Sequence, residues 1–166
     1  MLTAHELFGF MSPALSNQIL ETAYESDKDN YRLAIGAVAE ARKLRPAFFE
    51  RKPRQERHLE MAAMLAKPRL DGAASSLIRI WLMKKHPQML VDFLDALSVP
   101  HKEGVVDDLP ATMEDPKLRG AIEKLLGKYP REEVAVYLNA FYSMNDVSWL
   151  NLKTLLESDA RLQFGI

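Results

Sequence analysis

Two stretches of the chain repeat nearly the same phrase, and each is built around a proline. The first is LMKKHPQMLVDFLDAL, from Leu82 to Leu97, and the second is LLGKYPREEVAVYLNAF, from Leu125 to Phe141. In both, a lysine and a ring-bearing residue precede the proline, and an aromatic-Leu-(Asp/Asn)-Ala-apolar run closes the phrase. Proline is favoured at the first helical position, where its missing N–H costs nothing and its φ is already helical. The phrase therefore predicts a helix that begins at each proline.

The wider pattern, a proline followed after nine or ten residues by an alanine and a bulky residue, occurs four times. The prolines are Pro13, Pro53, Pro87 and Pro130, spaced 40, 34 and 43 residues apart, and a second amphipathic segment follows each copy. These spacings resemble the architecture of helical-hairpin repeats such as TPR and HEAT proteins. The resemblance implies stacked antiparallel helix pairs, each burying its apolar face on the next. The alternative is an irregular helical bundle in which prolines simply begin helices.

Length and composition agree with a helical domain. A chain of 166 residues buries roughly 70% of its unfolded surface on folding, so it can form a core unaided. Only 7 glycines are present, too few for the tight turns of an all-β chain. We expect one all-α domain over residues 1–166, with seven to nine helices as stacked antiparallel pairs, solenoid-like or in an irregular bundle. A long acidic loop is expected at about residues 99–116.

Charge is sorted along the chain, although the formal net charge is only −1. Residues 1–41 carry a net −4, residues 42–86 a net +8 and residues 87–166 a net −5. The basic centre is densest between residues 42 and 57. Its cations are Arg42, Lys43, Arg45, Arg51, Lys52, Arg54 and Arg57.

A basic stripe interrupted by Phe48 and Phe49 could hold a phosphate backbone and stack a base. The alternative is that the long basic side chains coat a helix end while the rings pack inward. A whole-chain pI near 6.4 favours this alternative, because dedicated nucleic-acid binders have a strongly basic footprint.

The expected loop at 99–116 carries His101, Glu103, Asp107 and Asp108. These residues could bind a metal or a basic partner. The alternative is a solvated acidic loop stiffened by its prolines, and we favour it because the ligand spacing of a calcium loop is missing. We therefore expect a partner-binding loop at most, and no metal.

Sequence motifs of catalysis are missing from the chain. It has no HExxH, GxSxG, GxxxxGK[ST] or GxGxxG, and its four histidines are scattered. There is no cysteine, which fits a reducing compartment. We expect no cofactor, no signal peptide, no membrane span and a cytoplasmic location.

Three functions remain open. The first is a non-catalytic interaction or adaptor module for an unknown protein or peptide, with self-association through oppositely charged surfaces as a further expectation. The second is nucleic-acid binding through residues 42–57. The third is a small enzyme, which would need a cleft where a histidine or carboxylate meets a second polar group within hydrogen-bond reach.

Overall fold

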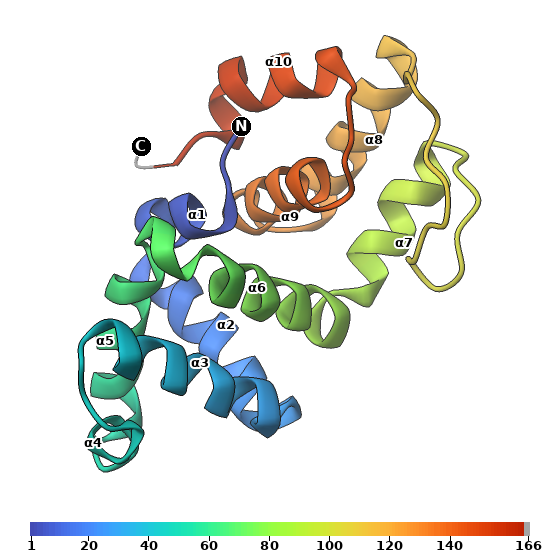
Figure 1. Ribbon diagram of the computed structural model, residues 1–166. Coiled ribbons are helices and arrows are strands. Elements are labelled where there is room, and N and C mark those ends of the chain that lie inside the picture. Colours follow the sequence, from blue (N-terminus) through green and yellow to red (C-terminus); the bar gives the residue numbers. More distant parts are fainter. Residues whose placement is uncertain (165–166) are drawn as a thin grey trace. The chain divides into compact units, whose positions relative to one another are not determined.

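The computed structural model describes residues 1–164, and this part of the chain is all-α, as expected. It contains ten α-helices, two short 3₁₀-helices and no strand (Figure 1). Nine of the α-helices have seven residues or more, so the expected number is exceeded only by one five-residue helix. By its internal contacts the chain divides into two compact units, which are described separately below. The single domain expected from the sequence stays a prediction.

The N-terminal unit comprises Leu2–Lys85, and the C-terminal unit comprises Met1 and the chain from His86 onward. The helices of the N-terminal unit are α1 (Ala4–Phe10), α2 (Pro13–Ser26), α3 (Lys28–Ala41), α4 (Pro46–Glu50), α5 (Arg54–Leu65), the 3₁₀-helix η1 (Pro68–Leu70) and α6 (Asp71–Lys85). Those of the C-terminal unit are α7 (Pro87–Ala96), α8 (Asp115–Lys128), α9 (Arg131–Met144), α10 (Leu150–Ser158) and the 3₁₀-helix η2 (Ala160–Leu162).

Proline lies at the start of seven of the twelve helices in residues 1–164. Seven of the nine prolines occupy an N-cap or one of the first two positions of a helix. They are Pro13, Pro46, Pro53, Pro68, Pro87, Pro116 and Pro130. The cause is steric, because the proline ring pushes the preceding residue out of the α region. Ser12, for example, is extended at ψ 152°, and its hydroxyl accepts a hydrogen bond from the Leu15 N–H at 3.2 Å. All four helix starts expected from the repeated pattern are present, whereas the stacked-repeat interpretation stays a prediction.

The core of the N-terminal unit forms where α6 packs against α2 and where α1 packs against α5 and α6. Apolar side chains at helical spacing on each helix point into this core and are fully buried. They include Ile19 of α2, Met61 and Leu65 of α5, and Ile78 and Trp81 of α6. Burying a side chain of this size contributes about 1.5–3 kcal/mol. Helices α4 and α5, which carry most of the basic segment, therefore belong to a unit with a well-packed core.

Helix α9 is the centre of the C-terminal unit. Its residues Val134–Phe141 are buried without interruption, as expected for a helix covered on all sides. The ring centroid of Phe93 lies 5.5 Å from that of Tyr137 and 5.2 Å from that of Phe141, while Phe141 lies 5.7 Å from Trp149. These edge-on and tilted ring pairs join α7 and the residue before α10 to α9.

The connection between α7 and α8 runs from Leu97 to Glu114, close to the expected loop. It is fastened to the unit by hydrogen bonds rather than by secondary structure. The indole N–H of Trp149 donates to the carbonyl of Pro110 at 2.7 Å, and the amide of Asn151 donates to the carbonyl of Met113 at 2.7 Å. Near its outer end the loop makes a tight turn with an isolated bridge between Lys102 and Val105.

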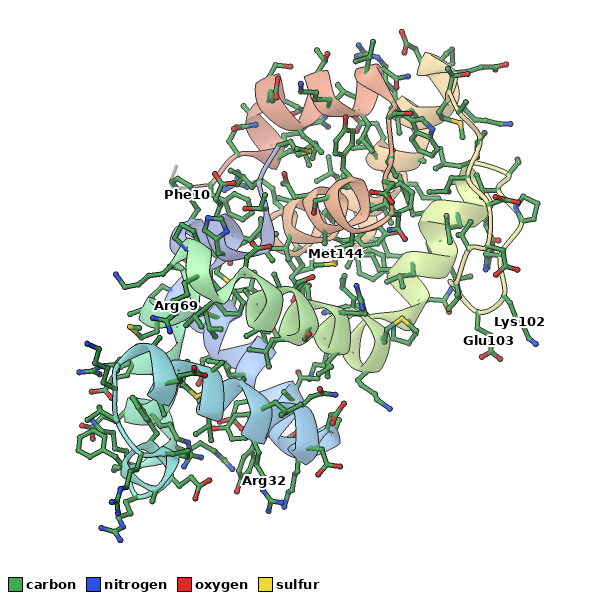
Figure 2. All side chains as sticks on the ribbon, viewed as in Figure 1. Phe10, Arg32, Arg69, Lys102, Glu103 and Met144 are labelled. Atoms are coloured by element: carbon green, nitrogen blue, oxygen red, sulfur yellow. The ribbon has the colours of Figure 1, made fainter. Side chains whose placement is uncertain are left out.

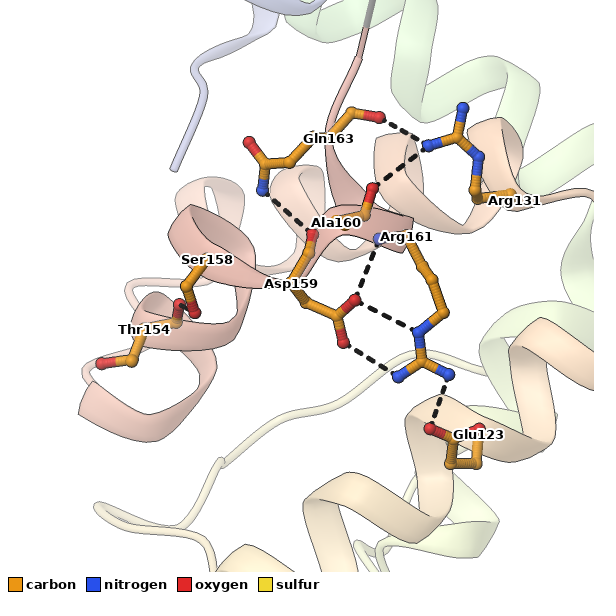
Figure 3. Close-up of polar contacts among 8 residues, drawn as sticks. All are labelled: Glu123, Arg131, Thr154, Ser158, Asp159, Ala160, Arg161 and Gln163. Carbon is orange, nitrogen blue, oxygen red and sulfur yellow. Dashed lines mark hydrogen bonds and ion pairs between the residues drawn. The ribbon is translucent and has the colours of Figure 1, made fainter. Parts of the chain in front are cut away.

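Residues 159–163, which follow α10, are held by polar contacts (Figure 3). The guanidinium of Arg161 pairs with Asp159 at 2.9 Å and with Glu123 of α8 at 2.7 Å. Arg131 of α9 donates to the carbonyl of Gln163 at 2.9 Å.

Among residues 1–164, none of the helices has both the length and the apolar character needed to span a membrane.

Replacing Gly104 by alanine should destabilise the C-terminal unit. Gly104 has φ +87°, and a Cβ there would lie 2.9 Å from the Cβ of Leu90. We expect a loss of about 1–3 kcal/mol in the free energy of unfolding, measured by urea denaturation. The control is Gly120→Ala in the middle of α8, where nothing lies within 4 Å of the new Cβ. That change should stabilise by about 0.5–1 kcal/mol, and equal effects of the two substitutions would contradict the strain at Gly104.

Candidate partner-binding groove

The basic segment runs from the end of α3, through α4, into α5. Four of its seven cations are held by partners within the N-terminal unit. Lys52 donates to Glu60 at 2.7 Å, and Arg42 lies 3.7 Å from the other oxygen of the same carboxylate. Arg54 pairs with Glu21 at 2.9 Å. These side chains neutralise carboxylates of their own unit, so they contribute less to any external ligand.

Arg57 is the fourth engaged cation, and it is buried, with only 8% of its surface exposed. Its Nε donates to the hydroxyl of Tyr31 at 2.8 Å, and one terminal nitrogen donates to the carbonyl of Glu50 at 3.2 Å. It therefore does not belong to an exposed basic stripe.

The other three cations, Lys43, Arg45 and Arg51, are exposed, and within residues 1–164 none of their side chains has a hydrogen-bond or ion-pair partner. Lys43 ends α3 in the left-handed region at φ 56°. Between the other two lies Phe48, which is 47% exposed, whereas its neighbour Phe49 is fully buried. The two rings anticipated from the sequence thus separate, one into the core and one to the surface.

These groups border an open groove beside α4, of about 700 Å³. The residues that line this α4 groove are Leu44, Arg45, Ala47, Phe48, Arg51, Lys52 and Pro53. The Lys52 ammonium lies 4.8 Å from the centre of the Phe48 ring, a cation–π contact that holds the exposed ring in place. The groove combines apolar walls, one aromatic surface and unpaired guanidinium groups.

The acidic loop does not gather its four candidate residues at one point. The Gly104 N–H donates to Nδ1 of His101 at 3.0 Å, so Nε2 carries the proton and donates to Asp95 at 2.7 Å. Glu103 is exposed at the outer end of the loop, beside Lys102 (Figure 2). Asp107 and Asp108 line a separate shallow pocket of about 250 Å³.

No three metal-ligating side chains come together within residues 1–164.

Sequence reasoning missed a buried polar cluster that joins three helices of the N-terminal unit. The hydroxyl of Tyr31 donates to Nε2 of His58 at 2.7 Å, while Nδ1 of His58 donates to Asn17 at 3.0 Å. Burial lowers the pKa of His58 to about 4, and the charges of Arg57 and Arg54 add to the effect. His58 is therefore neutral at pH 7, with one ring nitrogen accepting and the other donating.

No sequence spacing links these residues, because they come from α2, α3 and α5. Tyr31 and His58 lie within hydrogen-bond distance of each other, which is one of the two conditions stated for a small enzyme. However, both residues are almost completely buried, at 4% and 1% exposure, although Tyr31 lines a pocket.

A second cluster lies in the C-terminal unit, around Asp92. Burial alone would raise the pKa of this carboxyl, but hydrogen bonds from Lys128, Gln88 and Tyr129 outweigh it and lower the pKa to about 2. The donor distances are 2.7 Å for Lys128 and Tyr129 and 2.8 Å for Gln88. Lys128 and Tyr129 belong to the second copy of the repeated phrase, so its Lys-ring pair ties α8 to α7.

Comparisons with models of protein families, with curated proteins and with solved structures found no match to this chain.

Acidification should weaken the N-terminal unit through His58. The unfolded state binds a proton below about pH 6.5, whereas the folded state resists protonation down to about pH 4. Stability is therefore full above pH 6.5 and falls across this window, by about 2 kcal/mol between pH 7 and pH 5. Urea unfolding followed by tryptophan fluorescence, to which buried Trp81 of this unit contributes, measures it. His58→Gln, which cannot titrate, should lack this part of the pH dependence, and an unchanged profile would contradict the assignment.

Lys128→Ala should destabilise the C-terminal unit, because it removes a charged donor from the buried carboxylate of Asp92. We expect a lower free energy of unfolding at pH 7, measured by urea denaturation, with a larger loss than an exposed lysine on the same helix gives. Lys124→Ala on the same helix is the control, since Lys124 is exposed and has no partner in the described chain. Equal losses in the two variants would show that the effect is only one of net charge.

Proposed function

We propose that the protein is an interaction module whose α4 groove binds an acidic segment of a partner protein, with an apolar side chain of that segment against Phe48. The proposal rests on two features that occur together in the groove, namely free guanidinium groups and an exposed aromatic ring. Arg45 and Arg51 lack partners among the described residues, and an aromatic ring is exposed between them. Buried centres of protein interfaces are enriched in aromatic residues and arginine.

Charge supports an acidic partner. Guanidinium groups pair with carboxylates through two parallel hydrogen bonds, which gives both energy and geometry. The apolar lining from Leu44, Ala47 and Pro53 suits a leucine-sized or aromatic side chain beside those carboxylates. A segment that alternates acidic and apolar residues matches both parts of the groove.

Nucleic acid is the weaker candidate for the same groove. Proteins that bind DNA through its backbone commonly make about 6–10 phosphate contacts. Arg42, Lys52 and Arg54 pair with carboxylates of the unit, and buried Arg57 does not line this groove, so Lys43, Arg45 and Arg51 are the cations of the segment that remain here for phosphates. The apolar walls also have no role on a phosphate backbone.

A second copy of the chain is another source of acidic residues, since residues 87–166 carry a net −5. Self-association through opposite charges stays a prediction, as do the cytoplasmic location and the hypothesis of a small enzyme.

Fluorescence anisotropy with three labelled probes tests the proposal. The probes are a peptide of alternating glutamate and leucine, a peptide of equal charge with serine in place of leucine, and a single-stranded oligonucleotide of equal charge. The first should bind tightest. Arg45→Ala combined with Arg51→Ala should weaken it about tenfold or more, and Phe48→Ala should do so without changing the net charge.

The matched control combines Arg69→Ala with Arg79→Ala, which removes two exposed cations of the same unit that do not line the groove. Equal loss in both double variants would contradict a site in the groove.

Tightest binding of the oligonucleotide would instead support the nucleic-acid alternative. With three free cations in or beside the groove, the slope of log K against log[salt] for the single-stranded probe should be no steeper than about −2, against about −5 if all seven cations bound phosphates. Sedimentation of the unliganded protein tests self-association.

A further inference from the structure

A second pocket of the N-terminal unit, distinct from the α4 groove, is lined by cations and tyrosines. Its volume is about 230 Å³. The residues that line it are Tyr24, Lys28, Tyr31, Arg32, Ile35, Glu50 and Arg57. Pockets for drug-sized ligands measure roughly 300–1,000 Å³, so this one suits a smaller molecule.

The buried guanidinium of Arg57 is the unusual group in this pocket. Burying a charge is costly unless an opposite charge compensates it. Within residues 1–164, however, no carboxylate lies within ion-pair distance of Arg57, and its two hydrogen bonds go to neutral oxygens. Glu21, whose carboxylate lies 3.5 Å from Nδ1 of His58, pairs with Arg54 at 2.9 Å. The buried positive charge is therefore left for a ligand.

The guanidinium is also held in a fixed orientation. Tyr31 accepts from its Nε, and the proton of Tyr31 goes to neutral His58, so the tyrosine cannot turn away without breaking both bonds. The Glu50 carbonyl fixes one terminal nitrogen at 3.2 Å. The remaining N–H groups of Arg57 have no acceptor in the described part of the chain. Donors fixed in advance bind an anion at less entropic cost than flexible ones.

Two more cations stand at the rim. Arg32 projects outward from α3 (Figure 2), and Lys28 lies 5.6 Å from the centre of the Tyr24 ring. Both are exposed, and neither has a carboxylate partner within residues 1–164. With Glu50 counted, the pocket carries a net charge of +2.

We propose that this pocket binds a small phosphate monoester, with Arg57 as the buried anchor of the phosphate and Lys28 and Arg32 as rim contacts. A phosphate monoester carries a charge of about −1.5 to −2 at pH 7, which matches the pocket, whereas a single carboxylate would leave charge uncompensated. The apolar side chain of Ile35 and the ring of Tyr24 offer contact to a small organic group beyond the phosphate. Inorganic phosphate shares the chemistry, and the monoester adds these contacts.

Isothermal titration calorimetry of the full chain at constant ionic strength tests the proposal. The probes are glycerol 2-phosphate, inorganic phosphate and acetate. The monoester should bind tightest and acetate weakest. Binding of acetate as tight as that of the monoester, or no binding of the monoester at millimolar concentration, would overturn the proposal. A phosphoserine peptide that binds more than tenfold tighter than the monoester would overturn it in favour of phosphoprotein recognition.

Variants locate the site. Lys28→Ala combined with Arg32→Ala should weaken the monoester about three- to tenfold, because both side chains are exposed and each contact is screened. Arg57→Gln should weaken it about ten- to hundredfold. Because Arg57→Gln could unfold the unit, the rim variant is decisive on its own. The double variant Arg69→Ala with Arg79→Ala removes equal charge away from the pocket and should bind normally. Equal loss in this control would overturn the assignment.

Two further substitutions separate this pocket from the α4 groove. Glu50→Gln should tighten monoester binding, since it removes the one negative charge of the pocket, and Phe48→Ala should leave it unchanged. Tighter binding in Glu50→Gln together with loss in the rim variant supports the pocket even if the acidic peptide fails to bind the groove. Loss of monoester binding in Phe48→Ala would place the anion in the groove and overturn the proposal.

Discussion

The steric conflict between a proline ring and the residue before it organises this chain more than any other single interaction. It disfavours the α conformation at the preceding residue, so helices tend to end there and new ones to begin. Ser12, Arg45 and Lys67 show the result, each extended directly before a helix. A chain rich in helix-forming residues would otherwise favour fewer and longer helices. Because the boundaries are local, each helix can turn its apolar face toward the core of its own unit.

This local character explains how much of the fold could be predicted from sequence. The helical class, the four proline-led helix starts and the long connection after α7 all depend on neighbouring residues. The contacts of the repeated phrase, in contrast, depend on residues far away in the sequence. Its Lys128 and Tyr129 donate to Asp92, thirty-six and thirty-seven residues earlier, and these contacts exist only once α7 and α8 have packed. Periodicity reveals which face of a helix is apolar but not which carboxylate a lysine will reach.

The basic segment shows the same limit at the candidate site. From the sequence, seven cations form one set. In the structure they divide according to whether an oxygen acceptor lies within reach. Glu60 engages two of them, and Glu21 engages a third. The carboxylates that decide the matter lie on α2 and α5, so the sum of charges in a window overstates the free charge. Likewise Phe48 and Phe49 are adjacent in sequence, yet only the second is covered.

Arg54 and Arg57 differ in whether a carboxylate compensates their charge. They lie one helical turn apart on α5, and both approach the ring of Tyr24, at 4.5 and 5.9 Å from its centre. Arg54 has Glu21 as its counter-ion and is therefore satisfied within the fold. Arg57 instead has the hydroxyl of Tyr31, which orients a charge but does not neutralise it. A guanidinium that is buried, fixed and still uncompensated retains most of its attraction for an anion, because the surrounding protein screens it less than water would. Burial and the identity of the acceptor, rather than position in a basic run, therefore distinguish a structural arginine from one available to a ligand.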